Sequence, residues 1–99
     1  MKGVRVMPDE NGFLDPVAMR QPGAYGRCTA YDRKYPGSPL TFFEVTAPNG
    51  DCCCLDPKVH QIIEHDDGTI TVNPSIQFPG AQGQMNGWHG YLKSGEWTT

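Results

Sequence analysis

Three short turns, each ending in glycine, constrain the fold of this chain most strongly. Pro48-Asn49-Gly50, Asp66-Asp67-Gly68 and Lys93-Ser94-Gly95 each separate two short runs rich in apolar residues. Tight β-hairpins place glycine where the backbone needs a positive φ. No window of 11–18 residues shows the 3.6-residue apolar period of an amphipathic helix. The sequence therefore predicts a series of hairpins rather than a helical fold.

The rest of the chain extends this pattern into one mainly-β domain. A chain of 99 residues is expected to form a single domain over residues 1–99. Pro16 either confines residues 13–20 to an edge strand or breaks the strand. We expect strands at 3–7, 40–47, 51–55, 59–65, 69–72, 74–78, 88–92 and 96–99. The predicted fold is a small antiparallel sandwich or partial barrel built from hairpins, with little or no helix.

Residues 21–39 interrupt the strand pattern with proline, glycine and tyrosine. We expect an irregular arm here, because long loops in compact domains often carry function. A connector that follows the surface fits the same composition. The loop 79–87 is also polar and rich in glycine. The candidate binding surface on these two segments comprises Tyr25, Arg27, Tyr31, Arg33, Tyr35, Gln82 and Gln84.

The segment 51–60, DCCCLDPKVH, carries the densest potential chemistry. In a strand, Cys52 and Cys54 share one face and Cys53 takes the other, so the three cannot act as one triple ligand. The candidate metal ligands are Cys53, Asp56, His60 and His89, since zinc takes about four such ligands. Alternatively, strand cysteines act as small buried hydrophobes and the histidines are structural. We expect Cys52 and Cys54 to serve packing.

Composition argues against several classes of function. The net charge of −3 and the absence of any Lys/Arg run argue against broad nucleic-acid binding. No apolar stretch is long enough to span a membrane, and the N-terminus lacks the apolar region of a signal peptide. We therefore expect a cytoplasmic protein without a disulfide framework. No phosphate-binding loop or activated cysteine is evident, so we expect no catalytic residues and no cofactor, with zinc as the alternative.

The C-terminal half resembles a family of small uncharacterised phage and prophage proteins, sometimes labelled ammonia monooxygenase-like. The family pattern is C-x-x-C-x-x-x-H, then T-x-x-P-S-I, then W-H-G-Y-L-x-x-G. Cys53 and His60 match its first element, while Asp56 stands where the second cysteine would be. The other matching positions are Thr71, Pro74, Ser75, Ile76, Trp88, His89, Gly90, Tyr91, Leu92 and Gly95. The closing element of the family can carry cysteine in place of its tryptophan, and the family arrangement resembles a zinc ribbon. This chain lacks two of the thiolates, with Asp56 in place of one and Trp88 in place of the other.

The resemblance implies a phage-type accessory protein in the host cytoplasm that acts by binding a protein partner. The partner is a protein of the host or of its defence machinery, or else the chain is a minor virion or morphogenesis factor. A zinc-ribbon-derived metal-binding protein is one alternative. A nucleotide-binding sponge is another, in which tyrosine or tryptophan stacks on a base and Arg27 or Arg33 meets phosphate. A homodimer formed through an edge strand also fits the hairpin pattern.

Overall fold

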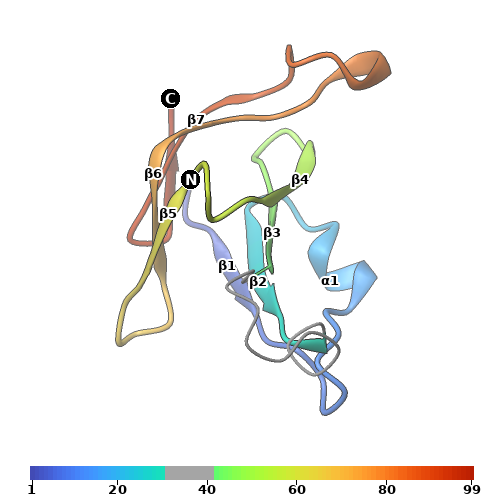
Figure 1. Cartoon of the computed structure of the whole chain (residues 1–99), viewed down its shortest axis with the longest axis vertical. Coiled ribbons are helices and arrows are strands. Elements are labelled where there is room, and N and C mark those ends of the chain that lie inside the picture. Colours follow the sequence, from blue (N-terminus) through green and yellow to red (C-terminus); the bar gives the residue numbers. More distant parts are fainter. Residues whose placement is uncertain (31–41) are drawn as a thin grey trace.

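Two four-stranded sheets make up the fold. The computed structural model describes residues 1–30 and 42–99. One sheet contains, in order, β1 (Val4–Val6), β2 (Ala24–Cys28), β3 (Phe42–Thr46) and β4 (Cys52–Leu55). The other contains β5 (Gln61–Glu64), β6 (Ile70–Gln77), β7 (His89–Lys93) and β8 (Glu96–Thr98). Figure 1 shows the two sheets on opposite sides of the molecule, which confirms the mainly-β prediction.

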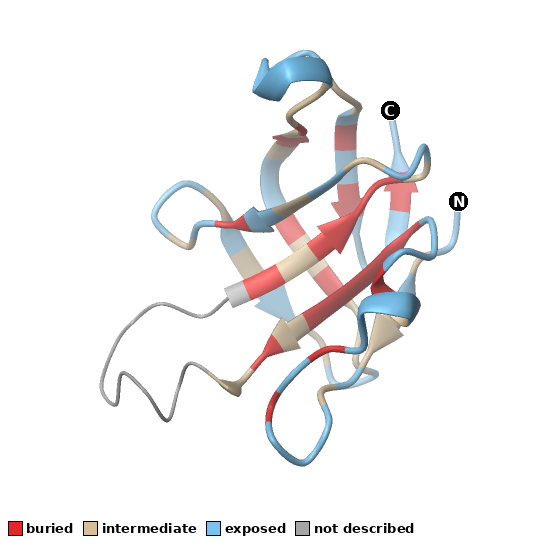
Figure 2. Cartoon of the chain, turned by 90° about the vertical axis from the view of Figure 1, so that its right-hand side faces the viewer, coloured by how far each residue is buried: buried red, intermediate tan, exposed pale blue. Residues whose placement is uncertain are grey.

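The main core lies between the two sheets. Alternate residues of β3 and β6 face inward, and Phe43, Val45, Ile70 and Val72 are each at most 1% exposed. This alternation is visible as buried bands along the strands in Figure 2. Trp97 fills the far end of the core with Phe78 and the half-buried Trp88. The hairpin prediction requires that every second side chain of a short strand be buried, and the strands of the core show this alternation.

The glycine turns take the backbone conformation that the sequence predicts. Gly50, Gly68 and Gly95 have φ values of +95°, +85° and +77°. Gly50 ends a turn in which its amide donates to the Ala47 carbonyl at 2.9 Å, so that β3 and β4 form a hairpin. The β5–β6 and β7–β8 hairpins form around the other two turns. Local turn chemistry therefore determines three of the strand pairings.

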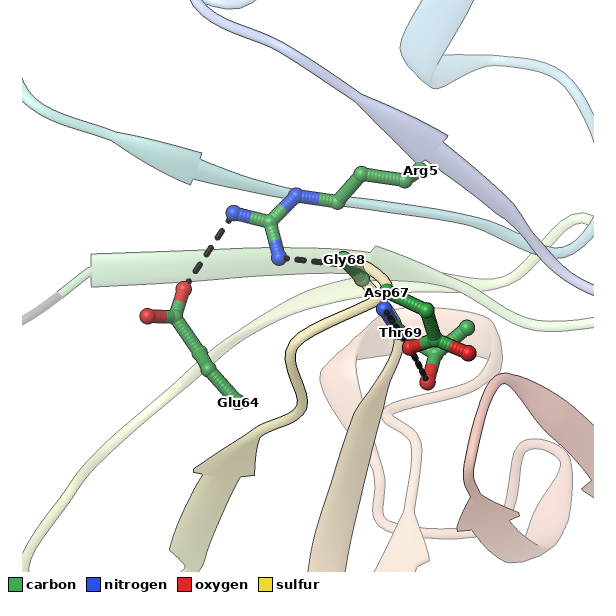
Figure 3. Close-up of polar contacts among 5 residues, drawn as sticks. All are labelled: Arg5, Glu64, Asp67, Gly68 and Thr69. Atoms are coloured by element: carbon green, nitrogen blue, oxygen red, sulfur yellow. Dashed lines mark hydrogen bonds and ion pairs between the residues drawn. The ribbon is translucent and has the colours of Figure 1, made fainter.

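The N-terminal segment ties the sheets together. The Gly3 amide donates to the Gly95 carbonyl beside β8 at 2.7 Å, and β1 then pairs with β2 in the other sheet. The Arg5 guanidinium crosses the gap to the Glu64 carboxylate and the Gly68 carbonyl, each at 3.2 Å (Figure 3). The β1–β2 pair is parallel, unlike the antiparallel pairing expected throughout. Parallel neighbours need a long connection, and residues 7–23 provide it.

That connection contains a short helix where an edge or broken strand was expected. α1 (Pro16–Met19) begins at Pro16, and the Asp15 carboxylate accepts a hydrogen bond from the Val17 amide at 3.0 Å. Proline suits the first position of a helix, because no backbone donor is needed there. Met19 on α1 packs with Leu14 on the outer face of the first sheet, and forms a second, smaller core with Ala24 and Cys28.

A 3₁₀ helix, η1 (Ala81–Gly83), lies in the 79–87 loop. No helix in the described part of the chain is long and apolar enough to cross a membrane.

Two further segments differ from the prediction. β2 occupies part of the segment 21–39 that was expected to be an irregular arm, and it pairs with both β1 and β3. β6 runs through Pro74, joining the two strands expected at 69–72 and 74–78. Its pairing with β7 shifts register between Val72 and Ile76, and such an irregularity accommodates a proline inside a strand.

Candidate functional site

A surface cleft of about 280 Å³ lies between β4 and the second half of β6. We call it the β4–β6 cleft. Its walls include the buried side chains of Leu55 and Ile76, so the cleft reaches the edge of the main core. Val59 and Met85 also line it, and they are 62% and 63% exposed. The remaining lining residues are Cys53, Cys54, Asp56, His60, Gln77 and Pro79. The cleft is therefore mainly apolar, with two large apolar side chains exposed to solvent.

Ser75 on β6 organises the histidines beside this cleft. His60 donates from Nε2 to the Ser75 carbonyl oxygen at 3.2 Å. The Ser75 hydroxyl and His89 Nε2 are hydrogen-bonded at 2.9 Å. His65, the remaining histidine, is hydrogen-bonded through Nε2 to the Thr71 hydroxyl at 2.7 Å. Each imidazole thus has a structural partner on β6, and the first two hold the 56–60 connection and β7 against that strand.

Cys53 points into the core side of β4. It is half-buried and packs against the cluster between the sheets. Burial raises the pKa of the Cys53 thiol from 9.0 to about 12, and the neighbouring Cys54 and Cys52 add to this increase. A thiol that keeps its proton is a poor nucleophile and a poor metal ligand. The environment of Cys53 therefore favours packing over reactivity.

The predicted metal ligands are brought near one another without converging. Cys53, Asp56 and His60 all line the β4–β6 cleft, while His89 lies outside its lining. Asp56 is exposed and accepts a hydrogen bond from the Lys58 amide at 2.8 Å. Within residues 1–30 and 42–99, no three or more His, Cys, Asp or Glu side chains are arranged to hold a metal ion.

The predicted binding-surface residues are dispersed. Tyr25 is 2% exposed and lies in the main core, which corrects the expectation that it forms part of a surface. Arg27 lines a cavity of about 460 Å³ with Phe43, His60 and Glu64. Gln82 and Gln84 are exposed in the loop around η1, at the upper end of Figure 1. Tyr31, Arg33 and Tyr35 lie outside the described residues. The structure therefore does not assemble the described members into one surface.

Cys52 and Cys54 face away from the core, on the side of β4 that carries α1. Both side chains are exposed, and no two of the four cysteines form a disulfide. The predicted alternation of the three cysteines is confirmed. The expectation that Cys52 and Cys54 serve packing is wrong, because the second sheet packs against the opposite face of β4.

The outer edge of β4 is unpaired by any other strand of the described residues. The Ala47 amide donates to the Asp51 carbonyl at 2.7 Å, so the β3–β4 ladder continues with hydrogen-bonded pairs at Cys53 and Leu55. The backbone N–H and C=O groups of Cys52 and Cys54 consequently point away from β3. They form a short row of unpaired groups beside the β4–β6 cleft.

Sequence reasoning missed Val59, Met85 and the free edge of β4. The sequence does contain one signal that could have identified Val59 and Met85. Each is a single large apolar residue in an otherwise polar connection. The cleft itself joins residues from β4, β6 and two loops, so no single stretch of sequence reveals it. No protein-family model matches the chain, and neither a curated protein nor a solved structure matches it.

Proposed function

We propose that the chain is a non-catalytic binding protein that captures an extended segment of a partner protein. The segment lies along the outer edge of β4 and places an apolar side chain in the β4–β6 cleft. The observation that carries this proposal is the exposure of Val59 and Met85, at 62% and 63%, around an apolar cleft beside a strand edge that no other described strand pairs with. Exposed apolar groups that surround a cleft mark interaction sites more often than isolated ones do.

The chemistry of the site suits a strand-like ligand. An added strand pairs its backbone with a free sheet edge, and alternate side chains enter neighbouring pockets. Cys52 and Cys54 supply the unpaired backbone groups, and Leu55 and Ile76 supply the apolar wall. Methionine adapts its shape to different apolar side chains, which fits the position of Met85 at this cleft. The resemblance to phage and prophage proteins supports a protein of the host cell, such as a component of its defence machinery, as the partner.

A displayed library of random peptides tests the proposal, because it samples many extended segments at once. We expect selection on the folded protein to enrich peptides with alternating apolar residues. Val59→Asp and Met85→Asp should each weaken the enriched peptides at least about tenfold, a loss of about 1.4 kcal/mol. Matched controls are Val17→Asp and Met7→Asp, because these side chains are 72% and 68% exposed and lie outside the cleft lining. Equal binding by the cleft variants and their controls would refute the proposal.

A metal-binding function is the second candidate, because Cys53, Asp56 and His60 line a single cleft. Metal analysis of protein purified without an affinity tag tests it. About one equivalent of zinc that disappears in His60→Ala would support this function. A zinc content below about a tenth of an equivalent would exclude it.

A further inference from the structure

A second cavity lies on the opposite side of β4, beneath α1. It has a volume of about 280 Å³, and it is lined by Pro16, Met19 and Arg20 of the α1 region and by Glu44, Cys52 and Cys54 of the sheet. The Thr46 hydroxyl donates to the Met19 carbonyl at 2.5 Å, which fixes the end of α1 over β3. The exposed residues Cys52 and Cys54 therefore share a cavity with Met19, whose side chain carries a thioether.

The spacing of these two thiols decides whether they can form a disulfide or bind one metal ion. Residues i and i+2 of a strand lie about 6.6 Å apart, and their side chains point in the same direction. A disulfide needs β-carbons about 3.5–4.5 Å apart, so Cys52 and Cys54 are too far apart to oxidise to one another. Two sulfurs that bind one metal ion in a line lie about 4.6 Å apart, given metal–sulfur bonds of about 2.3 Å. The two sulfurs reach that separation if the side chains rotate toward each other about their Cα–Cβ bonds.

The number and softness of the donors select the class of ion. Zinc takes four ligands. Cys53 also lines this cavity, but it packs against the core between the sheets, so Cys52 and Cys54 are the two exposed thiols on this side of β4. Thiolate and thioether groups prefer soft cations such as Cu(I). Glu44, opposite Cys54 in the β3–β4 register, adds a negative charge that favours a cation, while Arg20 lies across the cavity.

We propose that Cys52 and Cys54 form a two-thiolate site for one soft monovalent cation of the Cu(I) class in the cavity beneath α1. Binding exchanges two S–H bonds for two metal–sulfur bonds and releases two protons, with no change in oxidation state. The cavity beneath α1 and the β4–β6 cleft both include Cys54 in their lining and lie on opposite sides of β4, and the proposal does not depend on the peptide-binding function.

Titration with Cu(I) under anaerobic conditions tests the proposal. The fully reduced chain is titrated against a Cu(I) chelator, and native mass spectrometry counts the ions and the protons lost. We expect one Cu(I) per chain with the loss of two protons. Cys52→Ser and Cys54→Ser should each lower the affinity at least about a hundredfold. Cys53→Ser and Cys28→Ser are the matched controls, and we expect their affinities to stay within about threefold of the parent chain.

Several results would overturn the proposal. One is an equal loss of affinity in Cys53→Ser and Cys52→Ser. Another is a Cu(I) ion shared between two chains, which would show that the thiols act separately. Zinc binding as tight as Cu(I) binding to the same two thiols would contradict the assignment to a two-coordinate soft ion.

Discussion

The burial of Cys53 has a kinetic consequence that can be measured directly. At pH 8, about one in ten thiols with a pKa of 9.0 is ionised, because each pH unit changes the ratio tenfold. With a pKa of about 12, the ionised share of Cys53 falls to about one in ten thousand. Since the thiolate is the reactive form, we expect alkylation of Cys53 in the folded chain to be about a thousandfold slower than in the unfolded chain.

The assay uses a variant in which Cys28, Cys52 and Cys54 are replaced by serine, which keeps burial, the largest cause of the raised pKa of Cys53, in place. Iodoacetamide labelling is followed by mass spectrometry at pH 8, once in buffer and once in strong denaturant. A second variant that keeps only the exposed Cys52 is the control, and its labelling rate should differ little between the two conditions. If folded Cys53 is alkylated within about tenfold of its unfolded rate, the orientation of β4 described above is wrong.

Three further predictions concern stability. Thr46→Val removes the hydrogen bond to the buried end of α1 and should lower the free energy of unfolding by about 1–3 kcal/mol in urea denaturation; no change would mean that Met19 is not held by Thr46. Arg5→Met removes the link between the sheets in Figure 3 and should cost about 1–3 kcal/mol in the same assay; stability equal to that of a Glu64→Gln control would show that the carbonyl contact adds nothing. The Asn49 side chain and the Trp88 backbone amide donate hydrogen bonds to the Asp51 carboxylate and lower its pKa. Their stabilising effect on the folded state is therefore present above pH 3.8 and is lost as the pH falls further. The melting temperatures of the parent and Asp51→Asn should therefore converge in acid, and a constant difference would contradict this.

Turn chemistry made much of the fold predictable. The β3–β4, β5–β6 and β7–β8 hairpins each surround a glycine with positive φ, and the residues beside them alternate in burial. β2 was not predicted, because Gly26 and Arg27 break the apolar alternation and the strand forms through pairing with distant partners. α1 depends on Asp15 and Pro16, and the proline was interpreted as a strand breaker rather than as the first residue of a helix.

The candidate site was less predictable than the fold. Strand alternation separates Cys53 from its two neighbours, but it does not tell which face meets the core. That choice is made by the second sheet, which packs Ile76 and Phe78 near the Cys53 face. Val59 and Met85 can be recognised as parts of one site only from the structure, in which the 56–60 connection and the 79–87 loop both line the cleft. Such tertiary juxtapositions have no local pattern in a sequence.

Amide hydrogen exchange measured by NMR tests the central claim most directly. The folded chain is compared with and without a peptide selected on it. We expect the peptide to slow exchange at the amides of Cys52 and Cys54, because an added strand would pair with these outward-facing groups. The amides of Tyr91 and Lys93 on β7, which lies within the other sheet, should be unchanged. Unchanged exchange along β4, with new protection confined to β7, would contradict capture at the β4 edge.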